Sequence, residues 1–285
     1  MKRYRWALLV LFFGLPRAVS GQEITRTTYL ERPHYLIETA SATCLYDIRG
    51  GGFSSIRDLS GTEWIGFKPG NGEYPASAAA DYRGLPNLVF RGEDNGSGHP
   101  GFDQCISIQE GANVIHTTTR SGSWEWKWTF RDEGALLEIL KTDTSRCYWF
   151  LYEGTPGGRF LPPEQYWGTS ADGIRQDTPV LGHPAAGNWK WAFFGDQNHE
   201  TALYIIHLTP DTLTDNFSYM GNTIEGTAAP DGMVVFGLGR SGATPLMKGP
   251  NRFYIGFHPL DIHNQNSFDR FRKHVESIRD QYVHW

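Results

Sequence analysis

A carboxylate stands at the end of an apolar run and opens into a glycine-rich loop. The run Cys147–Gly154 reads C-Y-W-F-L-Y-E-G, and Glu153 is its last charged residue. Loops held by a rigid scaffold carry many catalytic groups, and a positioned carboxylate can transfer protons. Glu153 is therefore a candidate acid or base, although a carboxylate that binds loop amides would have the same surroundings.

The stretch that follows, Gly154–Gly187, contains three further candidates. An irregular segment of this length is uncommon unless it is functional or disordered. Tyr166 has a hydroxyl suited to proton transfer, Trp167 has a flat ring on which a sugar could stack, and Arg175 could bind a carboxylate. An Asp of the same loop could also pair with Glu153 in glycoside hydrolysis.

The remaining candidates are spread along the chain. A strand-end histidine is a candidate for proton transfer, although single histidines are more often structural. Cationic side chains and loop residues are candidates for holding a substrate carboxylate or sugar hydroxyls. These residues are His207 at the end of a strand-like run, Lys190 in N-W-K-W, Arg240 in the glycine-rich Gly237–Gly242, His99 in the loop Arg91–Gly101, and Lys127 between two tryptophans.

Motifs that would require a bound group are missing from the sequence. No H-x-H or H-E-x-x-H spacing occurs, and no cysteine pair has metal-site spacing. Gly237–Gly242 resembles a nucleotide-binding fragment but has no βαβ unit around it, and no G-x-S-x-G is present. We therefore predict neither a metal nor another cofactor.

The run Trp124–Phe130 indicates the architecture that must position these groups. Tryptophan and phenylalanine alternate there with Glu125, Lys127 and Thr129. Because a strand turns successive side chains to opposite faces, we expect an aromatic face and a polar one. The aromatic face is predicted to fill a core, while Glu125 and Lys127 would form a polar patch with Asn188 and Lys190 if their strands pair.

About fifteen short strand-like runs, many turn residues and one late helical stripe predict an all-β fold. The stripe spans Ser267–Tyr282, and the sequence shows neither an internal repeat nor a linker. We predict a single large antiparallel β-sandwich over residues 22–285. A β-propeller would need repeated blades, which the sequence does not show.

The N-terminus has the features of a secretory signal peptide. Basic residues precede the apolar run Trp6–Leu15, and small residues follow at Ala18–Gly21. Removal of residues 1–21 takes four basic residues away and leaves 22 against 31 acidic ones, a net charge of −9. We therefore expect a secreted or periplasmic protein whose partner is neither nucleic acid nor a membrane.

Export permits a disulfide, but the chain has an odd number of cysteines, Cys44, Cys105 and Cys147. For a domain of this size, free thiols or at most one bridge are expected.

Three segments carry a resemblance to a known group of proteins. The runs Tyr35–Thr43, Gly50–Asp58 and His99–Asp103 resemble segments of galactose mutarotase-like β-supersandwich proteins found among secreted bacterial carbohydrate-active enzymes. The resemblance implies a supersandwich fold and glycan chemistry. Mutarotases carry a histidine in an N-H-x-Y-F-like stretch, whereas the stretch here begins Asn216-Phe217, so no catalytic residue is carried over.

These observations favour a secreted enzyme that cleaves a poly- or oligosaccharide, most specifically a lyase acting on a uronate-containing glycan. Tyr166 and His207 would move protons, with Glu153 as orienter or alternative acid, and Arg175, Lys190 or Arg240 would hold the uronate carboxylate. Hydrolysis by Glu153 with a second carboxylate and non-catalytic glycan binding remain as alternatives.

Overall fold

The computed structural model describes residues 22–65, 87–90, 99–180, 182–220 and 233–283. The predicted signal peptide, the loop Lys68–Gly84 and positions 91–98 of the next loop lie outside the described residues. The described chain consists mainly of antiparallel strands, with one long helix near its C-terminus. This confirms the predicted all-β sandwich with a C-terminal helix.

The chain begins with a four-stranded antiparallel meander. Its strands are β1 (Glu23–Tyr29), β2 (Arg32–Glu38), β3 (Ala42–Asp47) and β4 (Gly52–Asp58). The turn between β1 and β2 places Leu30 and Glu31 at positive φ, at 49° and 62°, a conformation that side chains other than glycine rarely adopt.

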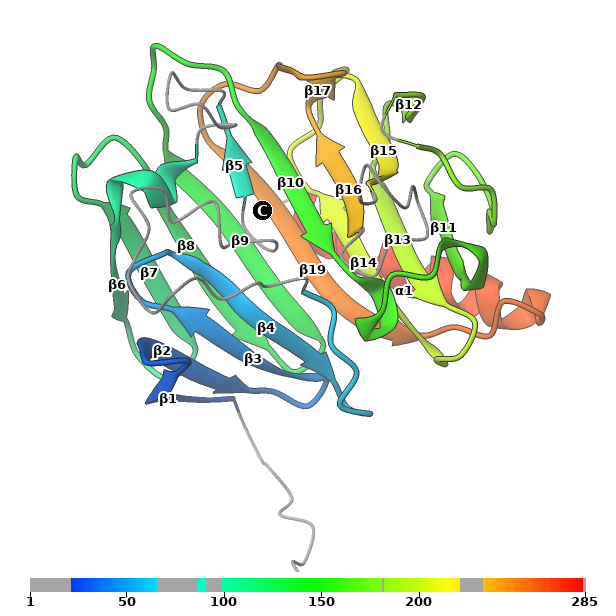
Figure 1. Ribbon diagram of the computed structural model, residues 1–285, viewed down its shortest axis with the longest axis horizontal. Helices are drawn as coiled ribbons and strands as arrows, with labels where there is room; N and C mark the ends of the chain where they lie inside the picture. The colour runs from blue at the N-terminus through cyan, green and yellow to red at the C-terminus, as the bar shows by residue number, and fades with distance from the viewer. Residues whose placement is uncertain (1–21, 66–86, 91–98, 181, 221–232, 284–285) are drawn as a thin grey trace, which may run out of the picture.

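Two larger sheets form the main sandwich (Figure 1). The five-stranded sheet has the order β12 (Ala185–Gly187), β15 (Asp215–Met220), β16 (Met233–Leu238), β10 (Trp149–Gly154) and β5 (Asn87–Val89). The eight-stranded sheet has the order β11 (Gln165–Thr169), β13 (Trp191–Asp196), β14 (Thr201–His207), β19 (Asn251–Pro259), β9 (Gly134–Lys141), β8 (Glu125–Arg131), β7 (Val114–Thr119) and β6 (Cys105–Gln109).

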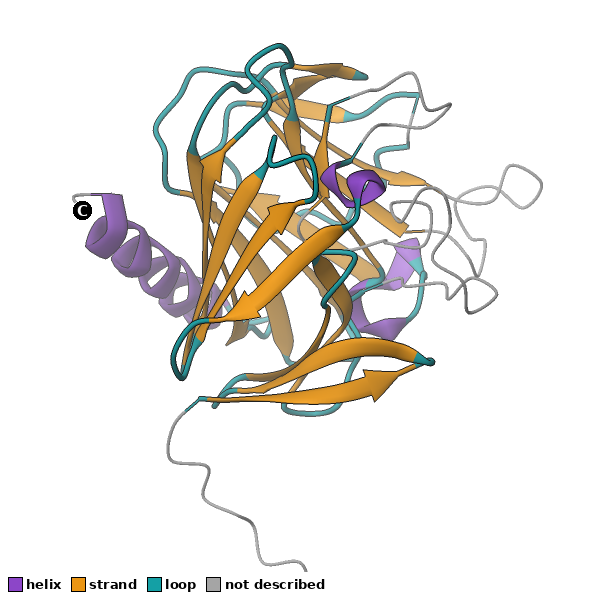
Figure 2. Cartoon of the chain, turned by 90° about the vertical axis from the view of Figure 1, so that its left-hand side faces the viewer, coloured by secondary structure: helices purple, strands orange, loops and turns teal. Residues whose placement is uncertain are grey.

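Short elements connect these sheets. A two-stranded ribbon, β17 (Arg240–Ser241) and β18 (Thr244–Pro245), follows β16. The described residues also form the 3₁₀ turns η2 (Pro100–Asp103), η3 (Pro156–Gly158) and η4 (Pro162–Glu164). The helix α1 (Gln265–Val283) lies on the side of the eight-stranded sheet that faces away from the five-stranded sheet (Figures 1 and 2).

The tryptophan strand packs as its alternation predicts. Trp126, Trp128 and Phe130 are about 1% exposed and belong to the core that the four-, five- and eight-stranded sheets share. Glu125 and Lys127 lie on the opposite face of β8 and are partly exposed. The predicted patch with Lys190 is wrong, because β14, β19 and β9 separate β8 from β13.

A second core fills the space between α1 and the eight-stranded sheet. The predicted helical stripe is confirmed. Its buried residues are Phe268, Phe271, Val275, Ile278 and Tyr282. They pack with aromatic residues of β11, β13, β14 and β19 that point away from the first core.

All three cysteines are free, two of them buried.

Candidate functional site

Strand β10 carries Glu153 on the outer face of the five-stranded sheet. Phe150 stacks on Phe253 of β19 with ring centroids 4.4 Å apart, and Tyr152 contacts Phe194 of β13 at 5.4 Å. Both partners belong to the eight-stranded sheet, so these side chains point into the space between the sheets. Strand alternation then turns Glu153 to the other face, where it is partly exposed.

A neighbouring amide fixes one oxygen of this carboxylate. Asn87 on β5 lies opposite Leu151 in the strand register. Its Nδ2 donates a hydrogen bond to Glu153 Oε2 over 3.2 Å. This contact orients Glu153 without neutralising its charge.

A cation shares the same face. Arg240 is 8% exposed, its Nε donates to the Gly242 carbonyl at 2.7 Å, and its guanidinium lies 4.8 Å from the centre of the Trp149 ring. Burial lowers the pKa of Arg240, and the negative charge of Glu153 opposes that shift. The two predicted residues Glu153 and Arg240 are therefore electrostatically coupled.

A glycine makes room for the arginine. Gly237 on β16 lies opposite Leu151, and a side-chain carbon at Gly237 would overlap Cδ of Arg240. The arginine therefore crosses the sheet directly above a position without a side chain. On β10, Leu151 lies between Trp149, over which the guanidinium is placed, and Glu153, which follows Leu151 by two residues.

Two polar residues that the sequence analysis missed hold the segment around Arg240. Asp215 accepts hydrogen bonds from the backbone amides of Trp189 at 2.7 Å and Gly239 at 2.8 Å, and burial raises its pKa to about 7. Asn216 Oδ1 accepts from the Gly242 amide at 2.7 Å. Neither residue stands in a recognisable motif, since their partners are about 25 residues away in sequence.

We call Glu153, Asn87, Trp149 and Arg240 the outer-face site. Arg240 can neutralise an anionic group, because its terminal nitrogens make no hydrogen bond within the described chain. Glu153 is a carboxylate and can accept or return a proton. The arrangement suits proton transfer beside a negatively charged substrate group.

His207 and Lys190 meet elsewhere, at the end of α1. Both line a small pocket of about 90 Å³ with Arg279 of the helix. Nε2 of His207 donates to Asn251 Oδ1 at 3.1 Å, and the ring stacks on Phe253. Burial lowers the pKa of His207. The predicted partnership of His207 with Glu153 is wrong, since this pocket contains neither Glu153 nor another outer-face residue.

The predicted roles of Tyr166 in proton transfer and of Trp167 in sugar stacking do not fit their burial. Both lie on β11, a strand missed in the sequence because glycine and proline surround it, and both are 0% exposed. Trp167 packs against Phe217 in the first core and Tyr166 lies in the second core beneath α1. Burial also raises the pKa of Tyr166. Neither ring reaches a ligand surface.

Arg175 stays at the surface, with no contact to the outer-face site. It pairs with Asp177 at 2.8 Å and lies 4.5 Å from the Trp167 ring centre. Ion pairing with that aspartate raises its pKa. These contacts fasten the segment after β11 to the strand, which is a structural use of the cation.

The last two predicted residues also have local structural contacts. His99 is 3% exposed and its Nδ1 accepts from the Gly101 amide at 2.8 Å, which caps the turn η2. Lys127 pairs with Glu138 on the adjacent strand β9 at 3.0 Å. Of the predicted residues, the structure therefore brings Glu153 near Arg240, His207 near Lys190, and Trp167 against Arg175, in three separate places.

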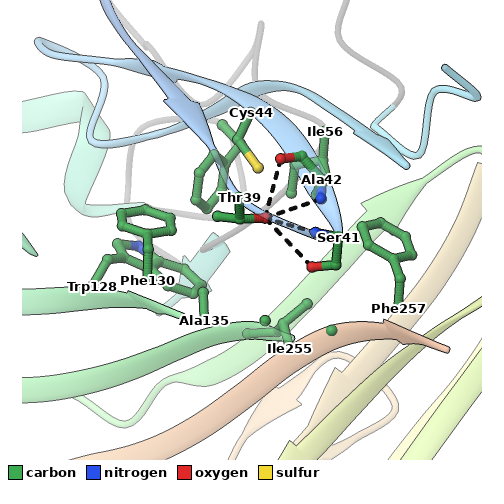
Figure 3. Close-up of a pocket in the computed structure, with 13 residues that line it drawn as sticks. Thr39, Ser41, Ala42, Cys44, Ile56, Trp128, Phe130, Ala135, Ile255 and Phe257 are labelled. Atoms are coloured by element: carbon green, nitrogen blue, oxygen red, sulfur yellow. Dashed lines mark hydrogen bonds between the residues drawn. The ribbon is translucent and has the colours of Figure 1, made fainter. Parts of the chain in front are cut away.

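An apolar pocket lies between β3, β4 and the eight-stranded sheet (Figure 3). Its lining includes Cys44, Ile56 and Phe130, and the Thr39 hydroxyl is engaged with its own turn. Burial raises the pKa of Cys44 to about 12, so the thiol is not a nucleophile at neutral pH. This pocket lacks the groups that acid–base chemistry requires.

Within the described ranges, no three His, Cys, Asp or Glu side chains are placed to hold a metal ion. No helix in the described part of the chain is both long and apolar enough to cross a membrane.

Comparison with known proteins shows similarity in structure only. No protein-family model matches the sequence, and no curated protein matches it either. Solved structures do match. A galactose 1-epimerase from Lactobacillus acidophilus is 10% identical with a TM-score of 0.51, over 84% of this chain and 99% of that one.

Two further structures are described as putative enzymes. An aldose 1-epimerase from Escherichia coli K12 is 10% identical with a TM-score of 0.53, over 84% of this chain and all of that one. A mutarotase from Salmonella typhimurium is 8% identical with a TM-score of 0.52, over 83% and 94%. At such identities the comparison shows the fold alone, and this chain has a galactose mutarotase-like β-sandwich.

Proposed function

We propose that this chain is a secreted carbohydrate-active enzyme that binds an acidic saccharide at the outer-face site and cleaves it by β-elimination. Arg240 would pair with the uronate carboxylate, which makes the proton alpha to it easier to remove. Glu153 would take that proton, a carbon–carbon double bond would form as the bond to the glycosidic oxygen breaks, and the departing oxygen would be protonated by Glu153 or by water.

The observation that carries this proposal is the placement of Glu153 and Arg240 on one sheet face. Support for a sugar ligand comes from the structural neighbours, which are described as sugar epimerases and mutarotases. The leader-like N-terminus supports export.

Hydrolysis is less well supported by the same geometry. Hydrolytic mechanisms normally use two carboxylates on either side of the scissile bond. In the described strands of the five-stranded sheet, Glu153 is the one carboxylate on the outer face. Asp215 lies on the same face of β15 as the core residue Phe217 and accepts hydrogen bonds from two backbone amides. A single carboxylate beside a cation fits proton abstraction better.

The test is a screen of the mature chain against uronate-containing and neutral polysaccharides. Absorbance at about 235 nm reports the conjugated product of elimination, and reducing ends report any cleavage. Both signals should rise on a uronate polymer. Reducing ends without absorbance would replace elimination by hydrolysis, and silence in both would remove the catalytic proposal.

Two variants assign the residues. Glu153→Gln should lower turnover by about 10²- to 10⁴-fold with binding retained, because the amide cannot accept the proton. Glu125→Gln, a carboxylate on β8 of the other sheet, is the matched control and should leave turnover unchanged. Equal activity of Glu153→Gln and the wild type would show that the proton acceptor is another residue.

A further inference from the structure

A second polar groove lies on the opposite side of the molecule from Glu153. It runs between α1 and the ends of β11 and β13, and has a volume of about 460 Å³. The groove continues into the smaller pocket beside His207, since Asn188, Lys190 and Arg279 line both. We call this continuous space the helix groove. Its volume falls in the range of about 300–1,000 Å³ typical of ligand sites.

Opposite charges face the helix groove without pairing. Lys190 and Glu276 both line it, and within the described chain neither makes an ion pair within 4.0 Å. Within the described chain, the one ion pair of Arg279 is with the adjacent Asp280, at 3.4 Å. An exposed pair of this kind contributes little, so the guanidinium remains available for other contacts.

Neutral hydrogen-bonding groups complete the lining. Trp191 is 1% exposed and lines the groove, yet its indole N–H donates no hydrogen bond within the described residues. Asn188 uses its Nδ2 on the Leu213 carbonyl at 2.7 Å, which leaves its carbonyl oxygen to accept. Ser170 accepts from the Lys190 amide at 2.9 Å, and its hydroxyl hydrogen can still be donated.

Donors and acceptors therefore alternate around one space. A simple anion would bind Lys190 and Arg279 but would face Glu276 and Asp280, and a simple cation would meet the reverse problem. Sugar hydroxyls each donate and accept, so a polyhydroxylated ligand can satisfy both sets at once. We propose that the helix groove binds a neutral saccharide unit.

The helix groove cannot share one sugar with the outer-face site. The helix and the five-stranded sheet cover opposite faces of the eight-stranded sheet (Figures 1 and 2). A ligand in the groove therefore anchors a glycan away from the chemistry. The proposal does not depend on whether Glu153 is catalytic.

The experiment uses the mature Glu153→Gln chain and neutral tetrasaccharides of glucose, xylose, mannose and galactose. Hydrogen–deuterium exchange should show new amide protection in segments 170–171, 188–191 and 276–280 with at least one of them. Protection confined to 149–154 and 235–242, or binding of none of the four, would overturn the proposal.

Variants distinguish a sugar from an anion. Lys190→Ala and Glu276→Ala should each weaken tetrasaccharide binding about tenfold or more, whereas Lys141→Ala at the exposed end of β9 should not. Unchanged affinity in both groove variants would overturn the proposal. So would inorganic phosphate that protects the same segments and whose binding is lost in Lys190→Ala but strengthened in Glu276→Ala.

Discussion

The outer face of the five-stranded sheet and the helix-covered face of the eight-stranded sheet use glycine in the same way with different results. Under α1, a side-chain carbon at Gly195 would overlap the ring of Tyr166, and one at Gly256 would overlap Tyr204. On the outer face, Gly237 makes the same room for Arg240. Glycine lets a long side chain lie flat across a sheet in both places.

The element that covers such a side chain determines whether it serves packing or can meet a ligand. The tyrosine rings under α1 are buried by the helix, so their contribution is packing. Arg240 remains charged beside Glu153 and keeps terminal nitrogens without a hydrogen bond in the described chain. Residue type alone therefore does not identify chemistry, because the covering element determines whether a polar atom can meet a ligand.

The largest effect is expected for Trp167→Ala, which tests whether this ring serves packing alone. Because Trp167 is 0% exposed and packs on Phe217 at 4.4 Å, the variant should lose about 3–5 kcal/mol of unfolding free energy. Urea denaturation measures this loss. Arg175→Ala, which removes only the cation above the ring, should cost less than about 1 kcal/mol. A stable Trp167→Ala chain that loses saccharide binding would restore this ring as a ligand platform.

Local patterns predicted the elements but not the neighbours. The alternation in Trp124–Phe130 and the stripe of α1 are properties of single elements, and both predictions are confirmed. The proximity of Glu153 and Arg240 depends on the pairing of β10 with β16, more than 80 residues away. No local pattern encodes that register.

The burial of Tyr166 and Trp167 could not be inferred either. They are consecutive, so a strand turns them to opposite faces, and a sheet with one open face would expose one of them. Strand β11 is covered on both faces, by α1 and by the five-stranded sheet, and all five of its residues are buried. Coverage on both sides is a property of the assembled layers.

Lowering the pH is expected to destabilise the packing of α1 on the eight-stranded sheet. His258 on β19 stacks on His274 of α1 with ring centroids 4.1 Å apart. Burial, with the positive charges of His274 and Arg270, lowers the pKa of His258 to about 4. Burial also lowers the pKa of His274, opposed by Glu133.

Because the unfolded chain takes up the proton first, folded stability is full near pH 7 and falls as pH drops from about 6.5 towards 4. His258 is partly exposed, so the expected loss is about 1–2 kcal/mol rather than the full shift. The free energy of unfolding, measured by urea denaturation at pH 7 and pH 4.5, should show this loss in the wild type and a smaller loss in His258→Gln. His263→Gln, at an exposed position, is the control. Identical pH dependence in wild type and His258→Gln would contradict the assignment.

A methyl group placed beneath Arg240 would test whether the outer face of the five-stranded sheet binds substrate. In Gly237→Ala the new carbon overlaps Arg240 Cδ, so the guanidinium must leave its position over Trp149. Affinity for the uronate substrate found in the screen should fall about tenfold, or about 1.4 kcal/mol. Gly173→Ala, where no atom lies within 4 Å of the new carbon, is the matched control for calorimetric titration. Unchanged affinity in Gly237→Ala would separate Arg240 from substrate binding.

The smallest effect is expected where the sequence suggested catalysis. The Tyr166 hydroxyl is buried beneath α1 and has no hydrogen-bond partner in the described chain. Removing a buried hydroxyl without a partner relieves a desolvation cost, so Tyr166→Phe should leave stability unchanged or raise it by up to about 1 kcal/mol. Turnover should stay at the wild-type level, measured with the substrate that Glu153→Gln no longer cleaves. A tenfold loss of turnover in a stably folded Tyr166→Phe chain would mean that the helix moves away during the reaction, and the division between a packed face and a reactive one would fail at that strand.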